Sequence, residues 1–211
     1  EDVTMLNNEI YKRMTEDVPT EHTYLSTDSV IGLDPNDDDA YDVSMLNALE
    51  PPNLPPHKLT LKQNCIVMLL CNINPAQGLC NGTRLIVTKL YRTCIRAKIL
   101  NGNFKGEEVL LSRCRMTTDS IDVSCKVQRV QIPVKLGFAM TFNKAQGQSF
   151  DVAGAYIRKP PFAHGHLYVA LSRARSKDKL IVQVLPDAFM GKLRPGSDDV
   201  FVPNIVYKEA L

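Results

Sequence analysis

A short polar stretch at residues 143–149, NKAQGQS, contains residue types that proteins use to bind anions. It follows an apolar run and combines the Lys144 cation, the permissive backbone of Gly147 and the Ser149 hydroxyl. A loop of this composition presents backbone N–H groups and a positive charge to a phosphate group. The stretch equally fits a solvated turn in which Gly147 only reverses the chain, and its spacing leaves both interpretations open.

A second stretch, HLYVALSRA at 166–174, has the apolar spacing of a helix with basic residues near its end. One helical face collects Leu167, Ala170, Leu171 and Ala174. This pattern predicts a helix over 167–175. An arginine held on a packed helix, here Arg173, can stabilise charge on a transferred phosphoryl group. The alternative is that Arg173 and Arg175 only compensate the dipole at the helix C-terminus.

Two histidines, His164 and His166, adjoin this second stretch. No cysteine or carboxylate stands at metal-ligand spacing from them, so we expect a structural or hydrogen-bonding role and no metal site. Aromatic residues also interleave with basic ones in this region. Exposed rings of this kind stack on nucleic-acid bases, whereas buried rings belong to the core. These residues are Phe138, Phe142, Phe150, Tyr156, Phe162 and Tyr168.

The composition is that of a globular protein, with 211 residues, 44% hydrophobic content and a net charge of +2. This length is enough for one sizeable core or two small ones. The balanced charge gives no global basic field, although the region 135–175 is locally basic. The cysteines are irregularly spaced and are expected to be reduced. We expect no membrane span, and the acidic start Glu1-Asp2 argues against a secretory signal there.

The first part of the sequence predicts two short helices separated by a strand and an acidic loop. We expect a helix over 3–14, a strand over 23–26, a loop over 34–42 and a second helix over 43–49. The proline cluster at 51–56 cannot continue that helix, so it is the predicted domain boundary.

The middle of the sequence predicts short strands separated by tight turns. Asn81-Gly82 and Asn101-Gly102 favour turns with positive φ. Five strands in about 75 residues are typical of a small barrel of SH3-like size. The expected strands span 65–71, 83–91, 94–100, 107–111 and 125–131.

After Pro133 the pattern changes to the alternation of an α/β layer. The expected elements are an apolar strand at 136–142, the loop 143–149, a strand at 153–157, the helix 167–175 and a strand at 179–184. The sequence therefore predicts an α/β domain that is interrupted by a small β-barrel.

No phosphate-binding loop of the form G-x-x-x-x-G-K-[ST] occurs in the sequence. No apolar strand ends in paired acids that would hold Mg²⁺ beside such a loop. We therefore expect that this chain does not bind and hydrolyse a nucleotide by itself.

Three segments together carry a family resemblance: residues 54–87, 138–151 and 164–176. In this order they resemble the Pif-type (petite integration frequency) superfamily-one DNA helicases, and they look most similar to the subgroup that Helitron transposons encode. The resemblance implies a RecA-like second motor domain, of the P-loop-NTPase type, with an inserted SH3-like β-barrel. The first motor domain, with the phosphate-binding loop and the Mg²⁺ ligands, is then expected upstream in the same polypeptide. The implied divisions are 1–56 and 133–186 for the motor domain, 57–132 for the barrel and 187–211 for a C-terminal tail.

The resemblance also implies roles for the 143–149 stretch, which matches the fifth helicase motif. On this basis Asn143, Lys144 and Ser149 are the expected DNA-binding residues. Gln146 and Gly147 are the expected contacts to the edge of the nucleotide.

Arg173 matches the arginine of the sixth helicase motif, which the resemblance assigns as the catalytic contact to the γ-phosphate of ATP. ATP and Mg²⁺ are the implied cofactors of the full-length enzyme, with the Mg²⁺ ligands outside this chain. The implied activity is movement along single-stranded DNA in the 5′ to 3′ direction by a nuclear, monomeric enzyme.

Two positions depart from the family pattern, because Asn143 stands where histidine is common and His166 where glutamine is common. Two alternatives to the helicase therefore stay open. One is a separate module that binds single-stranded DNA without motor activity. The other is a transposon-derived remnant that folds but has lost its function.

Overall fold

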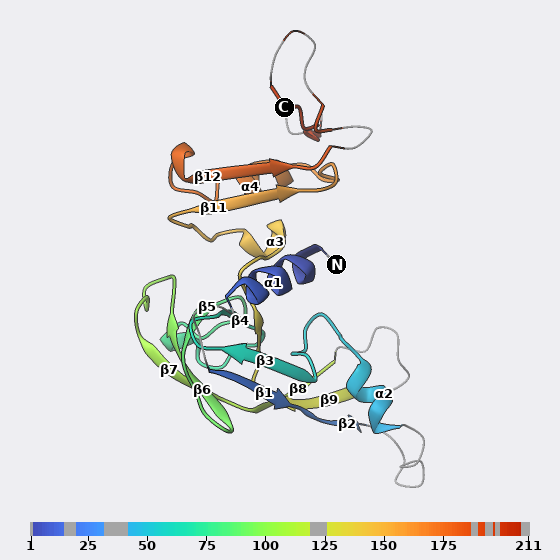
Figure 1. The fold of residues 1–211 in the computed structure, drawn as a ribbon, viewed down its shortest axis with the longest axis vertical. Helices are drawn as coiled ribbons and strands as arrows, with labels where there is room; N and C mark the ends of the chain where they lie inside the picture. The colour runs from blue at the N-terminus through green and yellow to red at the C-terminus, as the bar shows by residue number, and fades with distance from the viewer. Residues whose placement is uncertain are drawn as a thin grey trace. The chain divides into compact units, whose positions relative to one another are not determined.

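The computed structural model describes residues 2–14, 20–31, 42–118, 126–186, 190–192, 196 and 199–207. The chain forms two compact units, Glu1–Ala139 and Met140–Leu211, which we call unit 1 and unit 2 (Figure 1). The predicted acidic loop at 34–42 lies outside the described residues except for its last position, as do parts of the predicted tail at 187–211.

Unit 1 contains both helices that the sequence predicts before the proline cluster. α1 spans Asp2–Arg13, and its buried Asn7 side chain exchanges two hydrogen bonds with the backbone of Ala139, at 3.0 and 2.8 Å. α2 spans Val43–Ala48 and begins where the Asp42 carboxylate accepts a hydrogen bond from the Ser44 N–H, at 2.9 Å. Both predicted helices are confirmed.

The strands of unit 1 form antiparallel sheets. β1 pairs with β3, β9 lies between β2 and β8, and the largest sheet has the order β10-β4-β5-β6-β7. The strands span Glu21–Leu25 (β1), Thr27–Ile31 (β2), Lys58–Lys62 (β3), Ile66–Leu69 (β4), Arg84–Leu90 (β5), Cys94–Ile99 (β6), Glu108–Ser112 (β7), Cys114–Thr117 (β8), Lys126–Gln131 (β9) and Val134–Leu136 (β10), and a short 3₁₀ helix, η1, spans Pro75–Gln77.

The short strands predicted between tight turns in the middle region are confirmed as β4, β5, β6, β7 and β9. The predicted small barrel is not shown: no closed barrel is found in the described part of the chain, where β10 and β7 are the unpaired edges of an open sheet. Three strands that the sequence did not predict, β2, β3 and β8, complete the smaller sheets.

The two sides of the proline cluster belong to the same unit. β1 pairs with β3 along its whole length, and β2 pairs with β9 in the same way. These pairings join segments from both sides of the predicted boundary at 51–56 within unit 1. The division of the chain into motor-domain parts and a barrel stays a prediction.

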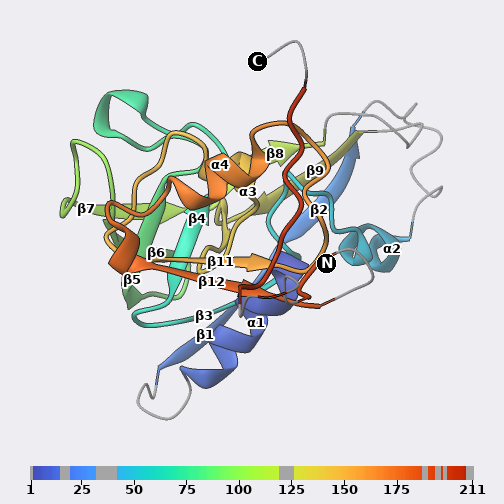
Figure 2. The ribbon, with the colours of Figure 1, turned by 90° about the horizontal axis from the view of Figure 1, so that it is seen from above.

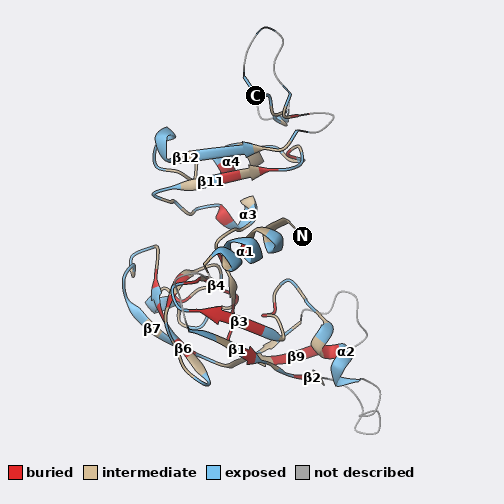
Figure 3. Ribbon diagram, in the orientation of Figure 1, coloured by how far each residue is buried: buried red, intermediate tan, exposed pale blue. Residues whose placement is uncertain are grey.

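The core of unit 1 comes from side chains that alternate along neighbouring strands. Much of β3 is buried (Figure 3). One face of β4, β5 and β6 contributes the buried residues Val67, Leu69, Leu85, Val87, Ile95, Ala97 and Ile99.

Unit 2 contains a parallel pair of strands, β11 (Ala153–Ile157) and β12 (Leu180–Val184), which confirms both strands predicted there. Two short helices, α3 (Phe142–Ala145) and α4 (His166–Leu171), contact each other, and α4 lies on one face of the strand pair (Figure 2). A 3₁₀ turn, η2 (Lys177–Lys179), leads into β12. No helix in the described ranges is both long and apolar enough to cross a membrane.

The strand predicted at 136–142 is wrong beyond its first residue, because β10 ends at Leu136. The N–H of Gly137 still donates to the carbonyl of Ile66, at 2.9 Å. The backbone of Ala139 is then held by the Asn7 side chain, so a side chain takes the place of a neighbouring strand.

Arg129 on β9 is fully buried, and its guanidinium uses all five of its N–H groups. It binds the Asp28 carboxylate of β2 through contacts of 2.9, 3.1 and 2.6 Å. Its other N–H groups donate to the carbonyls of Leu46, Leu49 and Pro55, at 3.0, 3.1 and 2.9 Å. One side chain thereby joins β9, β2, α2 and the proline cluster.

We expect Arg129→Met to lower the free energy of unfolding by about 3–5 kcal/mol, because it leaves a buried carboxylate and several carbonyls without their donors. Urea unfolding followed by circular dichroism measures this change. Arg115→Met removes the same charge from an exposed position on β8 and should change stability by less than about 0.5 kcal/mol. Equal effects of the two substitutions would contradict the assigned role of Arg129.

Candidate functional site

The 143–149 stretch begins as a single helical turn rather than as the predicted loop. The N–H of Ala145 donates to the carbonyl of Thr141 at 3.1 Å, and the N–H of Gln148 donates to that of Ala145 at 3.0 Å. Gly147 has a φ of 76°, a left-handed conformation that favours glycine. The backbone therefore turns sharply between Ala145 and Gln148.

All five residues of this stretch that the sequence singled out are exposed, whereas Ala145 is buried and anchors α3. A Cβ atom at Gly147 would meet no heavy atom within 4 Å, so the space beside its backbone is open to a ligand. The exposed residues are Asn143, Lys144, Gln146, Gly147 and Ser149.

The helix of the second stretch is shorter than predicted, because α4 ends at Leu171 and Arg173 lies beyond it. The Ser172 N–H closes the last turn on the carbonyl of Tyr168, at 2.9 Å. The Nε of Arg173 then folds back to donate to the carbonyl of Val169, at 2.7 Å. This contact to a carbonyl of the last turn favours the helix-end role that the sequence left open.

The Arg173 guanidinium also joins the two stretches. Its Nη1 donates to the carbonyls of Gln148, at 2.9 Å, and Ala145, at 3.3 Å. Its Nη2 donates to the hydroxyl of Ser172, at 2.8 Å. Four N–H groups of this partly buried side chain are therefore bound to protein oxygens.

Backbone contacts hold the ends of the two stretches together. Phe150 pairs with Ala174 in a parallel bridge. Its N–H donates to the carbonyl of Arg173 at 2.9 Å, and its carbonyl accepts from the N–H of Arg175 at 3.3 Å. The ion pair between Arg175 and Asp151, at 3.5 Å, has both side chains exposed and adds little to this linkage.

The structure brings the predicted anion-binding stretch and the predicted catalytic arginine together, because Arg173 donates to the carbonyls of Ala145 and Gln148. Arg173 turns toward the carbonyls of its own unit. The roles of the individual residues in DNA and nucleotide binding stay predictions. The sequence does not predict the partners of Arg173, because most of them are backbone carbonyls, which every residue carries.

The two histidines beside α4 have aromatic neighbours. His164 stacks on Tyr207, with ring centroids 5.3 Å apart, and its Nδ1 accepts a hydrogen bond from the Tyr207 N–H at 3.2 Å. The rings of His166 and Phe162 form a T-shaped pair, with their centroids 4.7 Å apart. The expected hydrogen-bonding role is confirmed for His164. Among the residues described here, no group of His, Cys, Asp and Glu could hold a metal ion.

The aromatic residues of this region divide between core and surface. Phe138 packs against the core of unit 1. In unit 2, by contrast, the Phe162 and Tyr168 side chains are 81% and 73% exposed.

Comparison with known proteins identifies similar sequences among helicases. A family model described as DNA helicase Pif1, 2B domain, matches residues 44–90. The ATP-dependent DNA helicase PIF1 of Xenopus laevis is 31% identical over 180 residues, which cover 81% of this chain and 25% of that protein. The ATP-dependent DNA helicase PIF6 of Trypanosoma brucei is 31% identical over 140 residues, 64% of this chain and 18% of that protein. The chain thus spans about a quarter or less of these two relatives.

Solved structures with a similar fold are also Pif1 helicases. The crystal structure of Pif1 helicase from Candida albicans has a TM-score of 0.59 and 25% identity, and the match covers 86% of this chain and 42% of that one. Pif1 helicase from Bacteroides in complex with ADP-AlF3 and ssDNA has a TM-score of 0.58 and 23% identity, covering 88% and 40%. In sequence and in fold, this chain is therefore similar to part of the Pif1 DNA helicases, which is consistent with a RecA-like α/β helicase domain.

Proposed function

We propose that this chain is the C-terminal motor half of an ATP-dependent Pif1-family DNA helicase that moves along single-stranded DNA. The observation that carries the proposal is the set of Arg173 contacts, which joins the two helicase-like stretches into one local structure. The similarity to PIF1 of Xenopus laevis over 81% of this chain supports the same function.

The DNA-binding side of the proposed site is the exposed surface of α3 and the turn after it. Lys144 supplies a cation, and Asn143 and Ser149 supply hydrogen-bonding groups beside it. The open space at Gly147 admits a phosphate close to the backbone. The similar Pif1 helicase from Bacteroides was solved with ssDNA, which agrees with this assignment.

The nucleotide-binding side is only partly present in this chain. Gln146 and Gly147 are exposed and fit one edge of a nucleotide. Arg173 reaches a γ-phosphate only if its guanidinium leaves the carbonyls of Ala145 and Gln148. ATP supplies the energy of movement when it is bound, and the Mg²⁺ ligands come from outside this chain. We therefore propose that the isolated chain does not hydrolyse ATP.

We propose that a part of the longer polypeptide outside this chain covers the parallel strand pair of β11 and β12. Ile181 and Val182 are 67% and 44% exposed, and adjacent residues on a strand point to opposite faces. Parallel sheets are normally buried on both faces, yet β12 is mostly exposed (Figure 3). The upstream motor domain would supply that cover.

The finer parts of the proposal follow the family resemblance. They are a 5′ to 3′ direction of movement, an SH3-like barrel within 57–132, a relationship to the Helitron-encoded subgroup, a monomeric state and a nuclear location.

Lys144→Ala should weaken binding of a labelled poly-thymidine oligonucleotide about three- to tenfold at low salt, because it removes a cation that contacts phosphate. The dependence of log K on log salt should become shallower by about 0.7. Fluorescence anisotropy over a salt series measures both quantities. Lys177→Ala removes an exposed cation from η2 and is the matched control. Unchanged binding by Lys144→Ala would exclude it from the DNA site.

Arg173→Lys, placed in the longer polypeptide, should reduce DNA-stimulated ATP hydrolysis by about 10³-fold or more, because lysine lacks the planar fork of donors. Arg175→Lys should leave turnover nearly unchanged. In the 211-residue chain Arg173→Lys should also lower Tm, since several carbonyls lose their donors. A variant with lower Tm and normal turnover would assign Arg173 a purely structural role.

Ile181→Lys should leave the Tm of the 211-residue chain nearly unchanged, because this side chain is exposed there. In the longer polypeptide the same change should lower Tm by several degrees, since it buries an unpaired charge. Thermal unfolding of both forms makes the comparison, with the exposed Lys179→Gln as control. A Tm that stays constant in both forms would contradict the proposed cover.

A further inference from the structure

Two cysteines of unit 1 that are far apart in the sequence lie beside the same segment of the chain. Cys114 is the first residue of β8 and pairs with Gln131 on β9. Cys71 lies just beyond the end of β4, and the N–H of the preceding residue, Leu70, donates to the carbonyl of Pro133 at 2.9 Å. Both cysteines are therefore placed next to the link between β9 and β10.

The thiol groups of these two cysteines contact each other. The S–H of Cys114 donates a hydrogen bond to the sulfur of Cys71. Both residues are partly exposed, so a small oxidant can reach them, and neither is in a disulfide. A disulfide forms only between cysteines whose side chains face each other. A contact between the two sulfur atoms meets this requirement.

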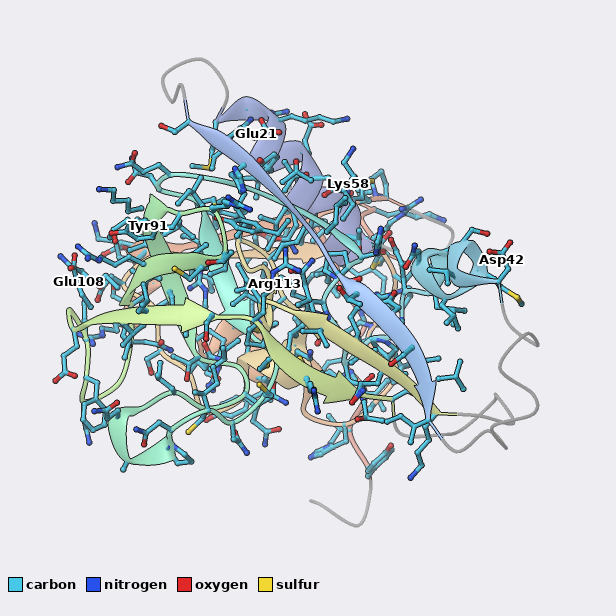
Figure 4. All side chains as sticks on the ribbon, turned by 90° about the horizontal axis from the view of Figure 1, so that it is seen from below. Glu21, Asp42, Lys58, Tyr91, Glu108 and Arg113 are labelled. Carbon is cyan, nitrogen blue, oxygen red and sulfur yellow. The ribbon has the colours of Figure 1, made fainter. Side chains whose placement is uncertain are left out.

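The backbone on both sides of this thiol pair is held by hydrogen bonds. Arg113, which lies between β7 and β8 (Figure 4), donates from Nη1 to the carbonyl of Leu25 at 2.6 Å. Next to Cys71, the Asn72 side chain accepts a hydrogen bond from the N–H of Asn81 at 2.8 Å. The fold thereby brings the two thiols together without a loop movement, and the entropy lost in closing the segment between them is part of folding itself.

The two thiols differ in how readily they lose a proton. Burial raises the pKa of Cys71, and the hydrogen bond from Cys114 acts in the opposite direction. Burial raises the pKa of Cys114 to about 11, with further contributions from the charge of Cys71 and from the hydrogen bond to it. The thiolate is the nucleophile in disulfide exchange. Cys71 is therefore the attacking group, with the protonated Cys114 beside it.

We propose that Cys71 and Cys114 are a modification site at which a small-molecule disulfide, such as glutathione disulfide, forms a reversible protein disulfide. The thiolate of Cys71 attacks one sulfur of glutathione disulfide, which breaks its S–S bond and releases one glutathione. Cys114 then loses its proton and attacks the Cys71 sulfur of the mixed disulfide, which releases the second glutathione. The two protein thiols are oxidised, glutathione disulfide is reduced, and the two thiol protons end on the two glutathione molecules.

The disulfide would join the two ends of a segment that contains most of the largest sheet. β5, β6 and β7 all lie between Cys71 and Cys114. Closing a loop of about 40 residues restricts the unfolded chain and so favours the folded state. Oxidation should therefore raise the Tm of the chain by about 5 °C or more.

The test places the 211-residue chain in glutathione buffers of increasing oxidised fraction, alkylates the remaining thiols and analyses unreduced peptides by mass spectrometry. The main disulfide should join Cys71 to Cys114. Thermal unfolding of the same samples should show the higher Tm, and dithiothreitol should reverse it. Cys71→Ser and Cys114→Ser should each abolish both the linked peptide and the rise in Tm.

The matched control is Cys80→Ser, which removes another partly exposed thiol and should leave the disulfide and the rise in Tm unchanged. An oxidised chain without the Cys71–Cys114 link, or one in which another cysteine pair or a linked dimer prevails, would overturn the proposal. An equal rise in Tm in oxidised Cys71→Ser would also overturn it. Neither measurement involves DNA or ATP, so this site stands or fails independently of the proposed function.

Discussion

A charged guanidinium that is removed from water must be paired and must have each of its N–H groups satisfied, and Arg129 meets both conditions. Gln131 lies two residues further along the same strand and is also buried. Its Nε2 donates to the carbonyls of Tyr24 and His57, at 2.9 and 3.1 Å. The inward face of β9 thus presents two polar donors, Arg129 and Gln131, beside the apolar Val127. Those donors hold the chain before and after the proline cluster, whose prolines have no N–H of their own.

An arginine side chain binds backbone carbonyls in unit 2 as well, with a different consequence. Arg173 also binds backbone carbonyls, but it is only partly buried and lies beside an exposed stretch. The N–H groups of Arg173 that bind the turn after α3 are the same N–H groups that would bind a phosphate. In the proposed function, local stability and phosphate binding are therefore coupled through the Arg173 side chain.

Two features of the chain raise the free energy of its folded state. β12 exposes apolar side chains on both faces, and the β5–β6 hairpin sets two like charges opposite each other. Each feature costs free energy in the isolated chain. The upstream motor domain proposed above would bury the exposed apolar side chains of β12. The exposed apolar surface of β12 agrees with the cover by an upstream domain proposed above, and the chain is similar to part of the Pif1 helicases.

Local pattern was enough to predict the helices of unit 1, the short strands between tight turns and the two stretches that define the candidate site, because each follows from residues within a short segment. Arg129 was not recognisable, because nothing in KVQRVQ separates its charge from that of Lys126, and only the folded structure, where β9 pairs with β2, shows that Arg129 is buried. The partners of Arg173 and the opposition of Lys89 to Arg96 were equally hidden. Periodicity is a property of the chain, whereas the partner of a polar group depends on register, bulges and contacts between distant segments, which exist only in the folded structure.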